Sequence, residues 1–182
     1  MRKLAFAFAL LAGPAMATGI EIDVAGEGAN GTIAIDLFED VAPRHVERIT
    51  TLAEQGAYDD VVFHRVIDGF MAQTGDVEFG KQGGDMRRAG MGGSDMPDLP
   101  AEFSDQPFDV GVVGMARSQN PDSANSQFFI MFAPAPHLNG QYTVVGKVTA
   151  GHDVVDAIKR GTGRNGAVVG QPDRMTAVRV TQ

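Results

Sequence analysis

The sequence predicts a mostly β domain, in which about eight short strands form an antiparallel sheet closed into a barrel, together with two α-helices. Two observations favour this class. Short runs in which apolar and polar side chains alternate recur along the chain, as in half-buried strands. Only two segments have the three- to four-residue spacing of apolar side chains that is typical of a helix. Helices therefore do not separate the strands as they do in a βαβ protein.

Residues 1–17 have the pattern of a secretory signal peptide. Two basic residues open the chain, Leu4–Leu11 is apolar, and Ala15-Met16-Ala17 resembles a cleavage site of small residues. The apolar run is too short to span a bilayer as a helix, which needs roughly 20 residues. We therefore expect cleavage near Ala17-Thr18 and a periplasmic or secreted protein that does not insert into a membrane.

The composition predicts that residues 18–182 form one domain. The chain has 182 residues, and the part after the signal peptide is long enough to bury a core without the help of disulfides, which its lack of cysteine excludes. The formal net charge of −8 becomes more negative once the basic start of the signal peptide is removed. Because such a surface repels phosphates and anionic lipids, we expect neither nucleic acid nor a membrane as a partner. We also expect a monomeric protein.

The first two predicted strands flank a motif that resembles a nucleotide loop. Ile20–Val24 and Ile33–Leu37 alternate as strands do, and GEGANG between them satisfies the pattern G-x-G-x-x-G. A dinucleotide loop must open into a helix whose N-terminus meets the pyrophosphate, whereas a strand follows here. Asn30-Gly31 instead predicts a hairpin turn, and we expect no cofactor.

Two helices are predicted. The first covers Pro43–Gln55, with a proline in its first turn and Gly56 at its end. Its apolar face consists of Val46, Ile49, Leu52 and Ala53, and the side chains expected in solvent are Arg44, Glu47, Arg48 and Glu54. The second covers Gly151–Arg160, with Lys159 and Arg160 beside its C-terminal dipole and a stop at Gly161.

The other predicted strands are Val61–Ile67, Phe70–Thr74, Val110–Met115, Ser126–Phe132, Tyr142–Val148 and Met175–Thr181. Between the second and third of these lies Gly80–Pro100, which is rich in Gly, Asp, Met and Pro and has no periodicity. Loops of this length inside a compact domain are usually functional or mobile.

The turn that follows Ile67 decides which side chains of the central hairpin share a face. A two-residue turn would put Arg65 and Gln73 on opposite faces. A three-residue connection, Asp68-Gly69-Phe70, sets Arg65 directly opposite Gln73 with Met71 on the same face, and we predict this register. The Gln73 carbonyl can then hold the guanidinium, which offers only donors. A cation in an apolar setting without a nucleophile suits a reaction that only shifts charge, such as rotation about an X-Pro bond.

The strand Ser126–Phe132 is apolar on both faces. Phe128, Ile130 and Phe132 share one face, while Gln127, Phe129 and Met131 share the other. One face fills a core, and the other is either covered by another element or forms a binding surface. We expect Phe128, Ile130, Phe132 and Val144 to fill the barrel, which leaves no ligand cavity inside it.

Three segments together resemble the motifs of the cyclophilin-type peptidyl-prolyl cis-trans isomerases. They are FHRVIDGFMAQTGD (Phe63–Asp76), GMARSQNPDSANSQFFI (Gly114–Ile130) and HLNGQYTVVGKV (His137–Val148), and the likeness runs from about Ile20 to Val180. The resemblance implies an eight-stranded antiparallel barrel capped by two helices, with a proline-binding groove on its outer face. It also implies that proline-containing polypeptides, such as folding proteins, are the substrates and that no cofactor is needed.

The resemblance also assigns site residues. The catalytic arginine falls on Arg65, and our hypothesis is that Arg65 donates a hydrogen bond to the prolyl nitrogen in the twisted amide. The implied proline pocket consists of Phe70, Met71, Phe129 and Leu138, with Gln73 beside the arginine. Ala116 and Gln127 match groove positions that contact the peptide before the proline.

The chain departs from the family pattern at a few positions. His137 stands where many members have tryptophan, and Tyr142 where many have histidine. Because tyrosine keeps a ring and a hydroxyl donor, we expect proline binding to persist. Without the indole, we expect the cyclic peptide inhibitor of the family to bind more weakly. Asp68 and Thr74 replace a proline and a glycine and are both compatible with turns.

Other classes of protein have less support. A metal-dependent hydrolase is disfavoured because the four histidines His45, His64, His137 and His152 lack metal-binding spacing. His64 alternates away from Arg65 and is expected to be a packed residue rather than a base. The alternative that stays open is a non-catalytic proline-peptide binding module, or a holdase chaperone, that uses the same groove.

Overall fold

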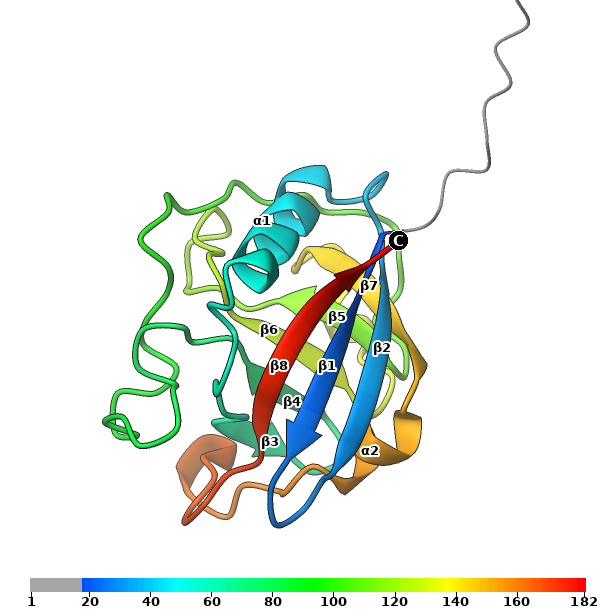
Figure 1. The fold of residues 1–182 in the computed structure, drawn as a ribbon. Coiled ribbons are helices and arrows are strands. Elements are labelled where there is room, and N and C mark those ends of the chain that lie inside the picture. The colour runs from blue at the N-terminus through cyan, green and yellow to red at the C-terminus, as the bar shows by residue number, and fades with distance from the viewer. Residues whose placement is uncertain (1–17) are drawn as a thin grey trace, which may run out of the picture.

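The computed structural model describes residues 18–182 (Figure 1). The predicted signal peptide, residues 1–17, lies outside the described residues. Within 18–182, the helices are too short or too polar to cross a membrane.

An eight-stranded antiparallel sheet forms the body of the molecule, with the strand order β3-β4-β6-β5-β7-β2-β1-β8. Its strands are β1 (Gly19–Ala25), β2 (Gly31–Leu37), β3 (Arg65–Ile67), β4 (Met71–Thr74), β5 (Val112–Met115), β6 (Phe128–Met131), β7 (Val144–Ala150) and β8 (Arg174–Thr181). The antiparallel pairing of β1 with β2 confirms that GEGANG forms a hairpin connection and not a nucleotide loop.

The prediction of a closed barrel is wrong, because the sheet is strongly curled but open between β3 and β8 (Figure 1). The backbone of the segment before β3 pairs with β8 at one isolated bridge, between Val62 and Arg174. Along β3 itself, the chain around residues 161–168 occupies the free edge, where Val66 O accepts from Gly161 N at 2.9 Å. Only Arg65–Ile67 of the strand predicted at Val61–Ile67 is regular. Val61 O still accepts from Met175 N of β8 at 2.8 Å, whereas His64 O and Val66 O accept from the 161–168 segment.

Two apolar clusters lie on the two faces of the sheet. The inner cluster fills the curl and includes Phe128 and Ile130, with the partly buried Phe132 packed against it. The outer cluster lies across β4, β5, β6 and the segment that follows β6, and it includes Phe129 and Met131. Strand β6 is thus buried on both faces, with all four residues buried.

The prediction that Val144 fills the interior is wrong. Val144 belongs to the outer cluster, and its neighbour Val145 is part of the inner one. A register irregularity between Val113 and Gly114, where β5 pairs with β7, accompanies this arrangement.

Helix α1 (Pro43–Glu54) lies over one end of the curled sheet (Figure 1). Its predicted apolar face is confirmed, since Val46, Ile49, Leu52 and Ala53 are buried. The expectation that Arg48 lies in solvent is wrong, because the residue is only 5% exposed. The Arg48 guanidinium donates to Pro97 O at 2.7 Å and to Asn125 O at 3.3 Å, so the cation fastens α1 to two loops.

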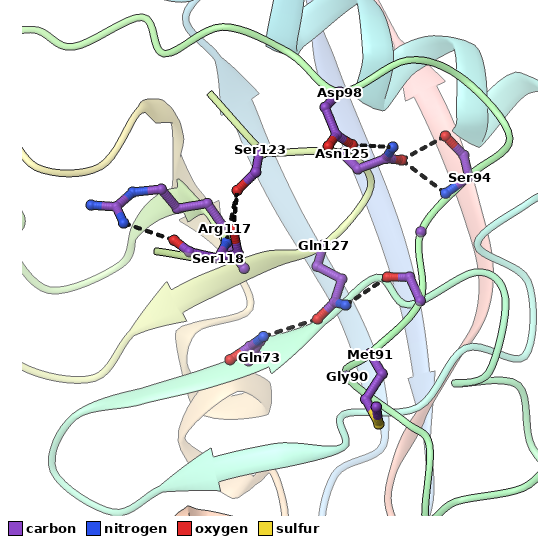
Figure 2. A pocket seen from close by; sticks show the side chains of 13 residues that line it. Gln73, Gly90, Met91, Ser94, Asp98, Arg117, Ser118, Ser123, Asn125 and Gln127 are labelled. Atoms are coloured by element: carbon purple, nitrogen blue, oxygen red, sulfur yellow. Dashed lines mark hydrogen bonds between the residues drawn. The ribbon is translucent and has the colours of Figure 1, made fainter. Parts of the chain in front are cut away.

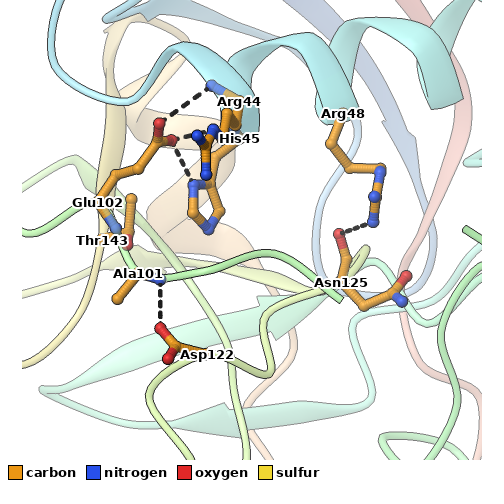
Figure 3. A network of polar contacts seen from close by, with 8 residues as sticks. All are labelled: Arg44, His45, Arg48, Ala101, Glu102, Asp122, Asn125 and Thr143. Carbon is orange, nitrogen blue, oxygen red and sulfur yellow. Dashed lines mark hydrogen bonds and ion pairs between the residues drawn. The ribbon is translucent and has the colours of Figure 1, made fainter. Parts of the chain in front are cut away.

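Glu102, from a loop distant in sequence, caps the N-terminus of α1 (Figure 3). Ala42 precedes the helix and offers no side-chain acceptor. The Glu102 carboxylate instead accepts from the backbone N–H groups of Arg44 at 3.3 Å and His45 at 3.2 Å, and it lies 2.6 Å from His45 Nδ1. A carboxylate at this end also complements the helix dipole. Burial lowers the pKa of His45, an effect that the neighbouring Glu102 partly opposes.

Helix α2 (His152–Ala157) ends earlier than predicted. Ile158 is already extended, with a ψ of 128°. The buried carboxylate of Asp173 accepts from Lys159 N at 2.8 Å, which draws the chain out of the helix. Lys159 and Arg160 therefore do not form the last turn, and they pair instead with Glu27 and Asp68.

We expect Glu102→Ala to lower the free energy of unfolding by about 1–3 kcal/mol, because α1 loses its cap and buried His45 loses its partner. Urea unfolding measures this change. Glu47→Ala, at an exposed position on the same helix, should change stability by less than about 0.5 kcal/mol. Equal effects of the two substitutions would contradict the capping role.

Candidate active site

The central hairpin has the predicted register. Arg65 pairs with Gln73, Val66 with Ala72 and Ile67 with Met71, so the connection contains three residues. Gly69 takes a φ of +65°, in the left-handed region that this type of hairpin loop requires. Arg65 and Gln73 therefore lie side by side on one face.

Two hydrogen bonds hold the half-buried Arg65. Nη1 donates to Gln73 Oε1 at 3.0 Å, and Nε donates to the carbonyl of Asn165 at 3.0 Å. Asn165 lies in the 3-10 turn η2 (Arg164–Gly166). Within residues 18–182, Nη2 makes no hydrogen bond to protein. Burial lowers the pKa of Arg65, but an arginine still stays charged at neutral pH.

A cavity of about 160 Å³, called here the proline cavity, lies beside Arg65. It is lined by Arg65, Phe70, Met71, Gln73, Ala116, Arg117, Phe129, Leu138 and Tyr142. Leu138 comes from the 3-10 turn η1 (Pro136–Leu138). Behind the cavity, the Phe129 ring stacks on Phe108 with centroids 5.7 Å apart and meets the Tyr142 ring edge-on at 5.8 Å. These contacts fix the aromatic wall.

A second, larger cavity of about 560 Å³, called here the flanking cavity, adjoins the first (Figure 2). The two share Gln73, Ala116 and Arg117 in their linings. Its other walls are the chain segments around Gly90–Ser94 and Ser118–Gln127. The two cavities together form a groove, and the loop at 80–100 is part of its wall.

A chain of hydrogen bonds connects Arg65 to this loop. Gln73 Nε2 donates to Gln127 Oε1 at 2.9 Å, and Gln127 Nε2 donates to Gly92 O at 2.8 Å (Figure 2). Gly92 N in turn donates to the buried carboxylate of Asp76 at 3.0 Å. Because each amide has both ends bonded, Gln73 can present only its oxygen to Arg65.

The structure brings most of the predicted site residues to one cavity. Arg65, Phe70, Met71, Gln73, Ala116, Phe129, Leu138 and Tyr142 all line the proline cavity. Gln127 lines the flanking cavity. His137 lines neither, and its ring stacks on Phe70 with centroids 6.0 Å apart. Sequence reasoning missed Arg117, although it directly follows Ala116 in the second motif.

The histidines do not form a metal site within the described chain, where no group of three or more possible ligands lies together. His64 is packed, as predicted. Both of its ring nitrogens are buried without a hydrogen-bond partner, and burial lowers the pKa of His64 to about 4.

The chain belongs to the cyclophilin-type peptidyl-prolyl cis-trans isomerases, since the family described as "Cyclophilin type peptidyl-prolyl cis-trans isomerase/CLD" matches residues 20–180. It is 60% identical over 148 residues to a Brucella suis protein named "Probable peptidyl-prolyl cis-trans isomerase", a match that covers 80% of this chain and 76% of the relative. It is 42% identical over 137 residues to "Peptidyl-prolyl cis-trans isomerase cyp15" of Rhizopus delemar, covering 71% of this chain and 20% of that relative.

A solved structure has the same fold. The cyclophilin type isomerase of Cryptosporidium parvum, crystallised in the presence of the dipeptide ala-pro, has a TM-score of 0.74 at 23% sequence identity. The match covers 90% of this chain and 99% of the other. Family and relatives together show that the protein is a peptidyl-prolyl cis-trans isomerase.

We expect His64 to make the protein less stable in acid. An unfolded histidine takes up a proton near pH 6.5, whereas the folded ring does so only near pH 4. The stability that the neutral His64 ring contributes to the folded state is therefore complete above pH 6.5 and is lost as the pH falls from 6.5 towards 4. Between urea unfolding at pH 7 and at pH 4.5, the wild type should lose up to about 3 kcal/mol more stability than His64→Leu. Equal losses would contradict this role.

Proposed function

We propose that this isomerase rotates X-Pro bonds without a covalent intermediate, with Arg65 donating a hydrogen bond to the prolyl nitrogen. The observation that carries the proposal is a half-buried guanidinium beside a cavity with aromatic and aliphatic walls, with Nη2 not bonded to protein in residues 18–182. Gln73 and Asn165 orient the guanidinium through its Nη1 and Nε groups. Nη2 is then the donor available to a bound peptide.

The proposed hydrogen bond acts on the transition state. Amide resonance gives a rotation barrier of roughly 18–20 kcal/mol, and in the planar amide the nitrogen lone pair is delocalised. In the twisted amide the nitrogen becomes pyramidal and can accept a hydrogen bond. An interaction of this kind lowers the barrier because the ground state does not make it.

Arg65 is not sufficient by itself. An acceleration on the order of 10⁵ needs roughly 7 kcal/mol. A charge-assisted hydrogen bond contributes about 1.5–3 kcal/mol net. We propose that the proline cavity accounts for much of the remainder: Phe70, Met71, Phe129 and Leu138 hold the ring and exclude water while the preceding residues rotate.

The proposed substrates are proline-containing segments of folding polypeptides. The presence of ala-pro with the Cryptosporidium parvum protein supports a proline ligand for this fold. The proline would occupy the smaller cavity and the residues before it the flanking cavity, where Ala116 and Gln127 lie. We further propose that the protein works as a monomer, since one chain carries every residue of the proposed site.

We expect Arg65→Ala to lower kcat/KM for a proline peptide by roughly 30- to 150-fold, the equivalent of about 2–3 kcal/mol. The rate of cis/trans exchange is monitored by NMR, and the melting temperature serves as a check on folding. Arg44→Ala removes an exposed arginine of α1 outside both cavities and should leave kcat/KM within twofold of the wild type.

Unchanged turnover in Arg65→Ala would contradict the proposed role. A proline-limited refolding assay distinguishes the proposed isomerase from the alternative, a holdase. A holdase would suppress aggregation equally in the wild type and in Arg65→Ala, and it would accelerate the slow refolding phase in neither.

We also propose that residues 1–17 direct export of a bacterial protein to the periplasm, as their basic, apolar and small-residue regions suggest. In a Gram-negative host, the full chain should appear in the periplasmic fraction with Thr18 at its N-terminus, as measured by mass spectrometry. Leu10→Arg interrupts the apolar region and should leave the chain uncleaved in the cytoplasm. Wild-type chains that stay uncleaved would contradict export.

A further inference from the structure

Arg117 occupies the boundary between the two cavities. It lines both the proline cavity and the flanking cavity. The resemblance to known isomerases assigns no role to Arg117. Its charge takes no part in the proposed rotation of the X-Pro bond. A half-buried cation at the junction of a peptide groove therefore needs its own explanation.

The Arg117 side chain is held in place. Nε and Nη2 donate to Gln141 O at 3.3 and 2.7 Å, and Nη1 donates to Ser118 O at 2.9 Å. The guanidinium lies over the Tyr142 ring, 4.3 Å from its centroid. An arginine carries five N–H donors, so these three bonds leave two N–H groups for another acceptor.

No carboxylate neutralises this cation within residues 18–182. Arg117 makes no ion pair there, although six ion pairs of other Arg and Lys residues form in the same range. Among the described residues, the proline cavity is lined by two arginines and no acid, and the flanking cavity by a single acid, Asp98. Asp98 is bonded to Asn125 Nδ2 at 3.0 Å, and in Figure 2 the Arg117 side chain extends away from it.

The groove thus has a local charge opposite to that of the protein. The whole chain has a formal net charge of −8, yet the arginines Arg65 and Arg117 both line the proline cavity. A charge that is immobilised by hydrogen bonds and ring stacking loses little entropy when it binds an anion, and a planar guanidinium suits a carboxylate.

We propose that Arg117 is a specificity-determining residue, which favours substrates with a carboxylate side chain one or two residues before the proline. This inference rests on the proposed function, in which the proline occupies the smaller cavity and the preceding residues the flanking cavity. A Glu or Asp at either position would meet the two unused N–H groups of Arg117. The preferred substrates are then segments of the type acidic-Pro or acidic-X-Pro.

The test compares peptides that differ only in charge. The probes are Ala-Glu-Pro-Phe and Glu-Ala-Pro-Phe with blocked ends, each paired with its Gln counterpart. Catalysed cis/trans exchange is measured by NMR at pH 7, because a coupled protease would add its own specificity. In the wild type, the ratio of kcat/KM for Glu over Gln should be roughly two- to fivefold at one or both positions. Arg117→Gln should bring the ratio close to one.

Two variants control for other causes. Arg117→Lys keeps the charge and should retain a ratio above one, and because each ratio uses a single preparation, partial unfolding cancels from it. Arg44→Gln changes the net charge of the protein by the same amount at an exposed site outside the groove and should keep the wild-type ratio.

A wild-type ratio of one or below at both positions would overturn the inference, and so would the same preference in Arg117→Gln. Either result with catalysis intact leaves the proposed function standing. Absence of catalysis on all four peptides would overturn both.

Discussion

The burial of strand β6 on both faces is the constraint on which the rest of the structure depends. Phe128 and Ile130 face the inner cluster that holds the curled sheet together, and Phe129 and Met131 face the outer cluster that backs the proline cavity. Because successive side chains of a strand alternate, one four-residue strand serves the core and the groove together. A shift of one residue in its pairing would exchange the two sets and destroy both.

A chain of hydrogen bonds between polar groups complements these two apolar clusters. It runs from the buried Asp76 through Gly92, Gln127 and Gln73 to Arg65. Asp76 also accepts from Gly90 N at 2.7 Å, so a single carboxylate fixes the wall of the flanking cavity. The orientation of the guanidinium therefore depends on a loop that comes well after it in the sequence. The hydrogen bonds of Asp76 and Gln127 to Gly90 and Gly92 hold this segment in place, although it has no periodicity.

Local patterns in the sequence predicted most of the fold and the site. The position of Arg65 opposite Gln73 followed from turn length and strand alternation, both of which are local properties. Contacts between distant segments could not be predicted in this way. The chain around Gly161 fills the edge that a closed barrel would have used, Asp173 ends α2 early, and Arg48 is buried because two remote loops offer carbonyls to it. Arg117 lies in the second motif but was not singled out, because the role proposed for it depends on two cavities that only the folded chain forms.

The pairing of the first and last strands has a consequence for modularity. Gly19 lies opposite Thr181, so the described chain starts and finishes at the same edge of the sheet (Figure 1). The groove lies on β3 to β6, and β8 approaches the segment before β3 at Arg174, which is the opposite end of β8 from Thr181. Further domains can therefore be joined at either end without approaching the substrate. In the Rhizopus delemar relative, the matching region makes up only 20% of the protein.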